Sequence, residues 1–165
     1  MVNLKSNYKV NRFDVFFYIK SLFQLMKPRV MSLVLFTSMV GLLIAPEQVS
    51  FTTSAISLFA VAMGAGAAGA LNMWYESDLD ALMTRTCLRP IPTGKVPKKQ
   101  ALWFGVVLSI ISITMLYYTA NLASSLLLAT TIGFYFFIYT IWLKRRTPQN
   151  IVIGGAAGAL PPVIG

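Results

Sequence analysis

Four long stretches without a charged residue dominate this sequence. They cover residues 30–46, 48–75, 100–143 and 147–165, and they are 17, 28, 44 and 19 residues long. A transmembrane helix needs about 20 mostly apolar residues. Only 12% of the 165 residues are charged, which is too few to cover the surface of a soluble domain of this size. The sequence therefore predicts an all-α polytopic membrane protein, a transmembrane helix bundle.

The longest uncharged stretch must cross the membrane twice. As one helix it would be about 66 Å long, against a hydrocarbon core of about 30 Å. Its most polar point is Tyr-Tyr-Thr-Ala-Asn at residues 117–121, which predicts a turn at the water interface. We therefore expect four complete helices and the start of a fifth, near residues 30–46, 51–75, 101–119, 122–143 and from about 150. Because no polar segment follows the last span, we also expect the chain to be a partial bundle.

The basic residues predict the orientation of the bundle. Six of the 14 Lys and Arg precede the first expected helix, five lie between the second and third, and three follow the fourth. All of them then lie on one side of the membrane, which the positive-inside rule makes cytoplasmic. This bias accounts for the net charge of +9, so the charge does not indicate binding to nucleic acid.

The chain divides into two expected regions. Residues 1–29 form a basic cytoplasmic segment, in which residues 13–23 mix aromatic, polar and charged side chains as an interfacial amphipathic helix does. This mixed composition does not fit a cleaved signal peptide. Residues 30–165 form the partial transmembrane domain, with a cytoplasmic loop at 76–100.

An acidic cluster follows the second uncharged stretch. Three of the five acidic residues in the chain, Glu76, Asp78 and Asp80, fall within five positions. On a continuing helix Asn72, Glu76 and Asp80 share one face within an arc of roughly 80°, and Asp78 points elsewhere. Hard cations such as Mg²⁺ prefer such oxygen ligands. We therefore predict a metal site at Asn72, Glu76, Asp78 and Asp80; the alternative is that each carboxylate pairs with a nearby Arg or Lys.

Cations follow this cluster at once. Arg85, Arg89 and Lys95 lie in a loop stiffened by prolines. Arginine grips phosphate oxygens in a planar fork, and lysine adds a point charge. The two groups together predict a site for a metal ion and a phosphate. Lys144 and Arg145, after the fourth expected helix, either orient that helix or bind acidic groups of a substrate.

Small residues fill the segment Gly-Ala-Gly-Ala-Ala-Gly-Ala at 64–70. It lacks the lysine of a phosphate-binding P-loop and lies inside an apolar stretch. Small residues allow close packing of membrane helices, and they also leave room for a bulky lipid-like substrate. Both interpretations stay open.

Two motifs resemble those of a known family. The first is similar to the first aspartate-rich motif of the intramembrane aromatic prenyltransferase superfamily and reads Asn72-x-x-x-Glu76-x-Asp78-x-Asp80, then Arg85-Thr-x-x-Arg89-Pro90 and Gly94. The second, from Lys144 to Gly165, resembles one branch, the protohaem IX farnesyltransferases. The resemblance starts near Leu22 and covers about half of a family member. Position 76 is Glu where the family pattern has Asp, and the second aspartate-rich loop of the family is absent.

The resemblance implies a fold and a reaction. The fold is a bundle of nine transmembrane helices with two aspartate-rich cytoplasmic loops. The reaction transfers a farnesyl group from farnesyl diphosphate to a vinyl group of haem B and gives haem O. Asn72, Glu76 and Asp80 would hold Mg²⁺ and the diphosphate with support from Asp78. The implied anion-binding residues are Arg85, Arg89 and Lys95 for the leaving diphosphate, and Lys144 and Arg145 for the diphosphate or the haem propionates.

The resemblance also implies a setting and leaves alternatives. The protein would lie in the bacterial inner membrane, or face the matrix in a mitochondrion, with haem A synthase or cytochrome oxidase assembly as partners. The first motif alone suits a quinone-precursor prenyltransferase as well. A non-catalytic membrane fragment that binds a lipid diphosphate is a further alternative, because a chain with one aspartate-rich loop is expected to form only part of an active site.

Overall fold

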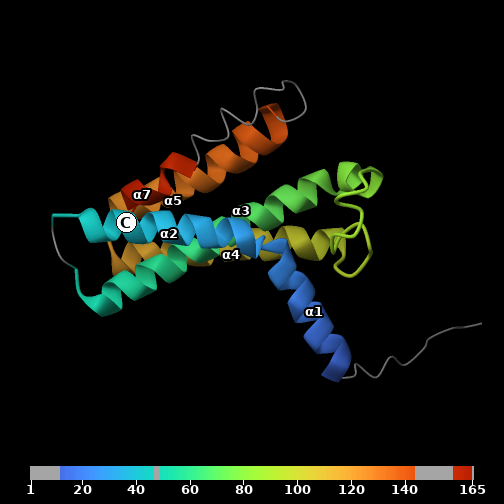
Figure 1. The fold of residues 1–165 in the computed structure, drawn as a ribbon, viewed down its shortest axis with the longest axis horizontal. Coiled ribbons are helices and arrows are strands. Elements are labelled where there is room, and N and C mark those ends of the chain that lie inside the picture. The colour runs from blue at the N-terminus through green and yellow to red at the C-terminus, as the bar shows by residue number, and fades with distance from the viewer. Residues whose placement is uncertain (1–11, 47–48, 144–157, 165) are drawn as a thin grey trace, which may run out of the picture.

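The computed structural model describes residues 12–46, 49–143 and 158–164, so the predicted start of a helix near 150 lies outside it. The described residues form helices joined by turns and contain no strand, which confirms the predicted all-α fold (Figure 1). The elements are α1 Arg12–Leu25, α2 Pro28–Ile44, α3 Phe51–Leu82, α4 Lys98–Thr119, α5 Leu122–Gly133, the π-helix η1 Phe134–Leu143 and the short α7 Pro161–Ile164.

Three helices are long and apolar enough to cross a membrane. They are α3, α4 and the continuous stretch Leu122–Trp142 formed by α5 and η1. Helix α2 is long and apolar enough only together with α1, from which it is bent by 54°. The described chain therefore has three candidate spans, or four if the bent pair counts as one. The prediction of a polytopic membrane protein is confirmed.

The turn predicted at 117–121 separates α4 from α5. Helix α4 ends at Thr119, and the side chain of Asn121 accepts a hydrogen bond from the backbone N–H of Ser124 at 2.7 Å. This contact caps the first turn of α5, where backbone N–H groups have no partner within the helix. A single Asn in a long apolar stretch thus ends one span and begins the next.

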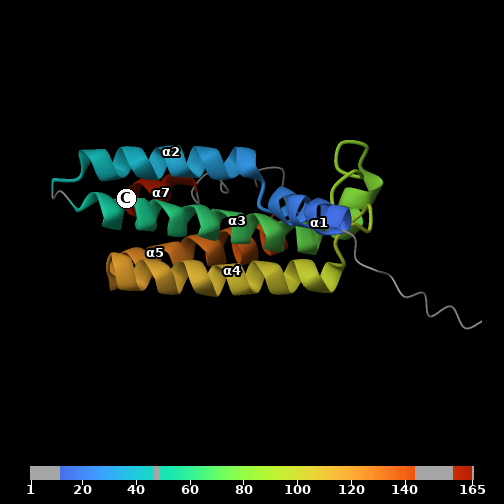
Figure 2. The same ribbon diagram turned by 90° about the horizontal axis from the view of Figure 1, so that it is seen from below.

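Helix α3 forms the centre of the bundle. Figure 2 shows α2 and α4 on opposite sides of it, and α5 and η1 also contact it. In the most apolar part of α3, 56% of the residues are buried, against 22% in the corresponding part of each of the other two spans. Small residues allow this position: a methyl group added to Gly64 would lie 2.8 Å from Leu128 Cδ1. The predicted packing role of the small-residue segment is therefore confirmed.

A corner at Lys27 joins α1 to α2. Among the described residues, Lys27 is the one non-glycine residue with positive φ, at 54°. Helix α1, which precedes this corner, is fixed by two contacts. Leu25 is fully buried beside α3 and α4, and the Tyr18 hydroxyl donates to Gln100 Oε1 at 2.7 Å. The predicted helix at 13–23 is present, and its place at a membrane interface stays a prediction.

The polar parts of the described chain gather at one end. Helix α1, the start of α2, the connection 83–97 and the start of α4 lie together, opposite the connections that join α2 to α3 and α4 to α5 (Figure 1). The described basic residues belong to these elements. The predicted loop at 76–100 is shorter in the structure, because α3 stays helical through Leu82. The acidic cluster therefore lies on a helix.

Candidate functional site

The last turns of α3 present one buried polar face. Asn72, Glu76 and Asp80 follow one another at four-residue intervals and are 0%, 4% and 4% exposed. The predicted common face of these three residues is present because the helix continues past them. Asp78 lies off this face and is exposed. The structure thus places three of the four predicted metal ligands on one buried face and leaves the fourth exposed.

Asn72 links three separate parts of the chain. Lys27 Nζ donates a hydrogen bond to Asn72 Oδ1, and Asn72 Nδ2 donates to Thr140 Oγ1 at 3.1 Å. Thr140 is fully buried, and its hydroxyl donates in turn to the backbone carbonyl of Tyr135 at 2.9 Å. The α1–α2 corner, α3 and η1 are therefore held at one point by a polar chain within an apolar bundle.

The π-helix supplies the third member of this chain. A π-helix widens the backbone turn, and such stretches occur frequently at functional sites. The Thr140 to Tyr135 bond spans five residues within η1. Aromatic rings from the same helix approach α3: Phe136 lies 6.2 Å from Trp74 and 6.5 Å from Tyr75, measured between ring centroids. The buried polar face is thus next to an aromatic wall.

Asp80 is paired with Arg89. Arg89 Nη1 lies 2.8 Å and 2.7 Å from the two oxygens of the Asp80 carboxylate. Thr86 adds a hydrogen bond from its hydroxyl to the Asp80 backbone carbonyl at 3.1 Å. The Asp80 side chain is 5% exposed and that of Arg89 is 27% exposed. A buried carboxylate is stabilised by such a partner, so Asp80 follows the pairing alternative in this structure.

The other predicted cations are either exposed or outside the described residues. Arg85 and Lys95 are exposed in the connection between α3 and α4. This connection turns at Gly94, whose φ of 73° suits glycine, and is fixed by the fully buried Val96. Lys144 and Arg145 lie outside the described residues.

The two carboxylates at this face are donors of the kind that magnesium takes, and a magnesium site here stays a prediction. No group of three or more His, Cys, Asp or Glu side chains converges in the described part of the chain. Magnesium, however, usually takes one or two carboxylates together with substrate phosphates and water. Glu76 and Asp80 offer two buried carboxylates one helical turn apart, which meets that requirement when a phosphate supplies further oxygens.

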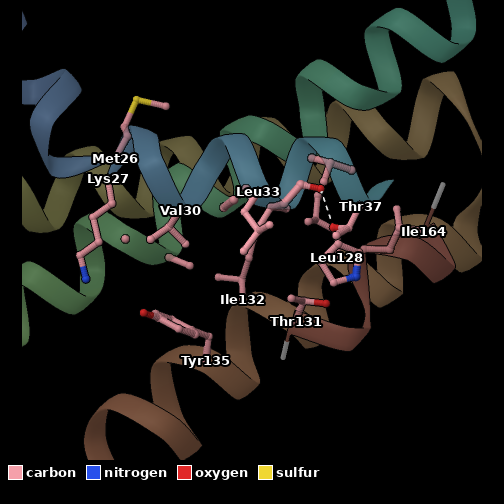
Figure 3. A pocket seen from close by; sticks show the side chains of 18 residues that line it. Met26, Lys27, Val30, Leu33, Thr37, Leu128, Thr131, Ile132, Tyr135 and Ile164 are labelled. Atoms are coloured by element: carbon pink, nitrogen blue, oxygen red, sulfur yellow. Dashed lines mark hydrogen bonds between the residues drawn. The ribbon is translucent and has the colours of Figure 1, made fainter. Parts of the chain in front are cut away.

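An apolar cavity of about 300 Å³ lies beside the polar face. Helices α2, α3, α5 and α7 form its walls, with Lys27 and Tyr135 at one end and Thr37 and Ile164 toward the other (Figure 3). Gly64 and Gly69 are part of the wall formed by α3. The small-residue segment therefore both packs against neighbouring helices and leaves space. Since Lys27 also contacts Asn72, the cavity and the polar face meet at this residue.

Sequence reasoning missed three residues of the site, Lys27, Thr140 and Tyr135. From the sequence, Lys27 was considered only as one of the basic residues that predict the orientation. Its position directly before Pro28, at the start of an apolar stretch, was the available signal for a cation at the edge of a membrane cavity. Thr140 lies in an uncharged stretch rich in Phe, Tyr and Ile. Nothing in this stretch distinguishes Thr140 or predicts a π-helix.

Comparisons with known proteins agree with the motifs. The model of the UbiA prenyltransferase family matches residues 34–165. A protoheme IX farnesyltransferase of Pelagibacter ubique is 66% identical over 166 residues, which cover 100% of this chain and 54% of the relative. Proteins of the same name from Methylocella silvestris and Ehrlichia ruminantium are 61% and 56% identical, over 85% and 89% of this chain and 44% and 50% of the relatives.

The chain spans about half the length of these curated relatives. No solved structure matches it. The family model covers most of the described helices, including the whole of α3 and its buried polar face. The chain therefore belongs to the UbiA prenyltransferase family.

Proposed function

We propose that the full-length gene product transfers a farnesyl group from farnesyl diphosphate to a vinyl group of haem B and forms haem O. The names of the relatives support this reaction. One observation carries the proposal: Lys27 lines the apolar cavity and also contacts Asn72 on the buried face that carries two carboxylates. Such a junction suits a substrate with a diphosphate at one end and a hydrocarbon chain at the other.

The cavity suits the farnesyl chain. Its volume of about 300 Å³ is at the lower end of the range of small-molecule sites. Its walls are mostly aliphatic, from residues such as Val30, Leu33 and Ile132. Burial of a hydrocarbon chain there contributes binding free energy in proportion to its area. The same walls keep water away from the allylic carbon while it reacts.

The polar face suits the diphosphate. When the diphosphate leaves, negative charge builds on its oxygens, and prepositioned cations stabilise that charge. Lys27 and Arg89 lie at the polar face and are fixed by Asn72 and Asp80. We propose that Glu76 and Asp80 hold a Mg²⁺ ion that, when bound, neutralises the diphosphate. The resemblance implies that Asp78, Arg85 and Lys95 also bind the diphosphate or its metal ion. Because these three residues are exposed, we assign them a smaller part in this binding.

The setting is also a proposal. The end of the bundle with the basic residues would face the cytoplasm, or the matrix of a mitochondrion, by the positive-inside rule. Farnesyl diphosphate and haem B would reach the site from that side. Haem A synthase or cytochrome oxidase assembly proteins would then receive the product.

Haem analysis in a host without its own haem O synthase tests this function. Extracted haem should show the mass of the farnesylated product when the full-length gene product is expressed. Asp80→Asn should abolish the product, because Asn neither pairs with Arg89 nor binds Mg²⁺ as a carboxylate does. The 165-residue chain expressed alone should give no haem O.

Two outcomes would contradict the proposal. Prenylation of hydroxybenzoate in place of haem would assign the protein to quinone synthesis. Magnesium-dependent binding of farnesyl diphosphate without any turnover of the full-length product would indicate a binding protein. Product that persists in Asp80→Asn would leave the reaction intact and remove the role given to Asp80.

A further inference from the structure

A second cleft lies between α1 and the connection 83–97. Its volume is about 380 Å³. Six of the described residues line it: Phe17, Tyr18, Lys20, Ser21, Gln24 and Lys95. None of these residues lines the apolar cavity. The fully buried Leu25, which follows Gln24 in α1, packs inward against α3 and α4, so the cleft is distinct from the site described above.

Two ammonium groups from different parts of the chain face this cleft. Lys20 comes from α1 and Lys95 from the connection between α3 and α4, and both are exposed. Among the side chains that the structure describes, no acidic residue lines the cleft, and neither lysine forms an ion pair with any of them. Like charges that share a concave site repel each other and attract an anion. The cleft therefore has the electrostatics of an anion site.

The backbone around both lysines is fixed. The Tyr18 hydroxyl donates to Gln100 Oε1 at 2.7 Å and ties α1 to the start of α4. Ser21 is buried, with its hydroxyl bonded to the Phe17 carbonyl at 2.8 Å. Val96, next to Lys95, is fully buried. The two lysines are thus held on opposite walls by contacts that do not involve their own side chains.

The surface beside the cleft is apolar. Helix α1 exposes several large hydrophobic side chains: Val15, Phe16, Phe17, Ile19 and Phe23. A helix that combines exposed aromatic residues with lysine is suited to the interface of a membrane. Lysines at that depth meet lipid headgroups, and anionic headgroups attract them.

We infer that this cleft binds the phosphate of an anionic phospholipid, whose acyl chains lie against the exposed apolar side chains of α1. The inference does not depend on the proposed reaction. In this inference Lys95 binds the phosphate of a lipid, whereas the resemblance implies that it binds the leaving diphosphate. The shared chemistry is a phosphate group between two ammonium groups, and a lipid and a soluble diphosphate are its two possible sources.

Native mass spectrometry of the full gene product in detergent separates these sources. The protein is titrated with dioleoylphosphatidylglycerol or dioleoylphosphatidylcholine, and the affinity of the first bound lipid is measured. We expect the anionic lipid to bind roughly tenfold more tightly, because each lysine near the surface favours it. The double variant Lys20→Gln with Lys95→Gln should lose about this tenfold preference.

Two further variants control for net charge and for folding. Lys98→Gln with Lys99→Gln removes the same charge from the exposed start of α4, outside the cleft, and should change the preference by less than about threefold. Lys20→Arg with Lys95→Arg should keep it. Equal loss in the Lys98 and Lys99 variant, equal binding of both lipids, or displacement of the lipid by millimolar inorganic diphosphate would overturn the inference.

Discussion

Glu76 and Asp78 lie two residues apart on the same helix, yet their surroundings differ completely. Glu76 is 4% exposed and shares its face with Asn72 and Asp80. Asp78 is exposed. A carboxylate is costly to bury and needs compensation, so the inward face of α3 is specialised in a way that the outward face is not. The position of a charge on the helix, rather than its presence in the motif, distinguishes the two.

The inward face of α3 is held by contacts with other parts of the chain. Asn72 is fixed by Lys27 and Thr140, and Asp80 by Arg89. These contacts hold the polar groups in place before any substrate arrives. Preorganised groups stabilise developing charge better than groups that must first reorganise. We therefore expect function to follow the inward face.

After the loss expected for Asp80→Asn, the largest effect should come from Glu76→Gln. This change keeps the size of the side chain and removes one buried negative charge from the predicted magnesium site. We expect the rate of haem farnesylation to fall by about 100- to 1000-fold, the usual loss when a main electrostatic group is removed. The rate should be measured in membranes with saturating farnesyl diphosphate. A rate close to that of the parent protein would show that the inward face is structural.

The next smaller effect on activity should come from Lys27→Met. It removes the cation that both lines the cavity and contacts Asn72, while the apolar stem remains. We expect kcat/KM for farnesyl diphosphate to fall by about 10- to 100-fold, because a charge-assisted contact is lost.

Lys27→Arg is the matched control for that change. It keeps the positive charge and should recover part of the activity. If Lys27→Met and Lys27→Arg lost activity equally while melting at the parent temperature, charge at this position would not be the cause.

A smaller effect is expected from Thr140→Val. The valine has a similar shape but cannot accept from Asn72 or donate to Tyr135. A buried amide left without a partner costs about 1–3 kcal/mol. The melting temperature in detergent should fall accordingly. Thr140→Ser keeps the hydroxyl, and a melting temperature as low as that of the valine variant would show that packing rather than the hydrogen bond matters.

Asp78→Asn should have the smallest effect. A substitution at an exposed position usually changes free energies by no more than about 0.5 kcal/mol. The farnesylation rate should therefore stay within about twofold of the parent rate. A loss comparable with that of Glu76→Gln would erase the distinction between the two faces.

Much of this architecture was predictable from local sequence. The uncharged stretches predicted the spans, because helix length and hydropathy are properties of single segments. The Tyr-Tyr-Thr-Ala-Asn turn was predictable because Asn121 caps a helix through its own neighbours. The common face of Asn72, Glu76 and Asp80 followed from helical periodicity alone.

The contacts that complete the site were not predictable in the same way. Lys27 and Asn72 are 45 residues apart, and Asn72 and Thr140 are 68 apart. Such pairs depend on how the helices pack and on the wide turn of η1, which no local pattern in Phe134–Leu143 reveals. The pairing of Asp80 with Arg89 was one of two alternatives, and the sequence offered no means to choose between them.

A binding measurement tests the central claim most directly. Calorimetric titration of the full gene product with a non-hydrolysable farnesyl thiodiphosphate, in the presence of Mg²⁺, compares Glu76→Gln with Asp78→Asn. Both variants remove one carboxylate charge from the same helix. We predict that only Glu76→Gln weakens magnesium-dependent binding, by at least about tenfold. Equal weakening in both variants, or none in Glu76→Gln, would contradict the account that the buried face of α3 holds the diphosphate.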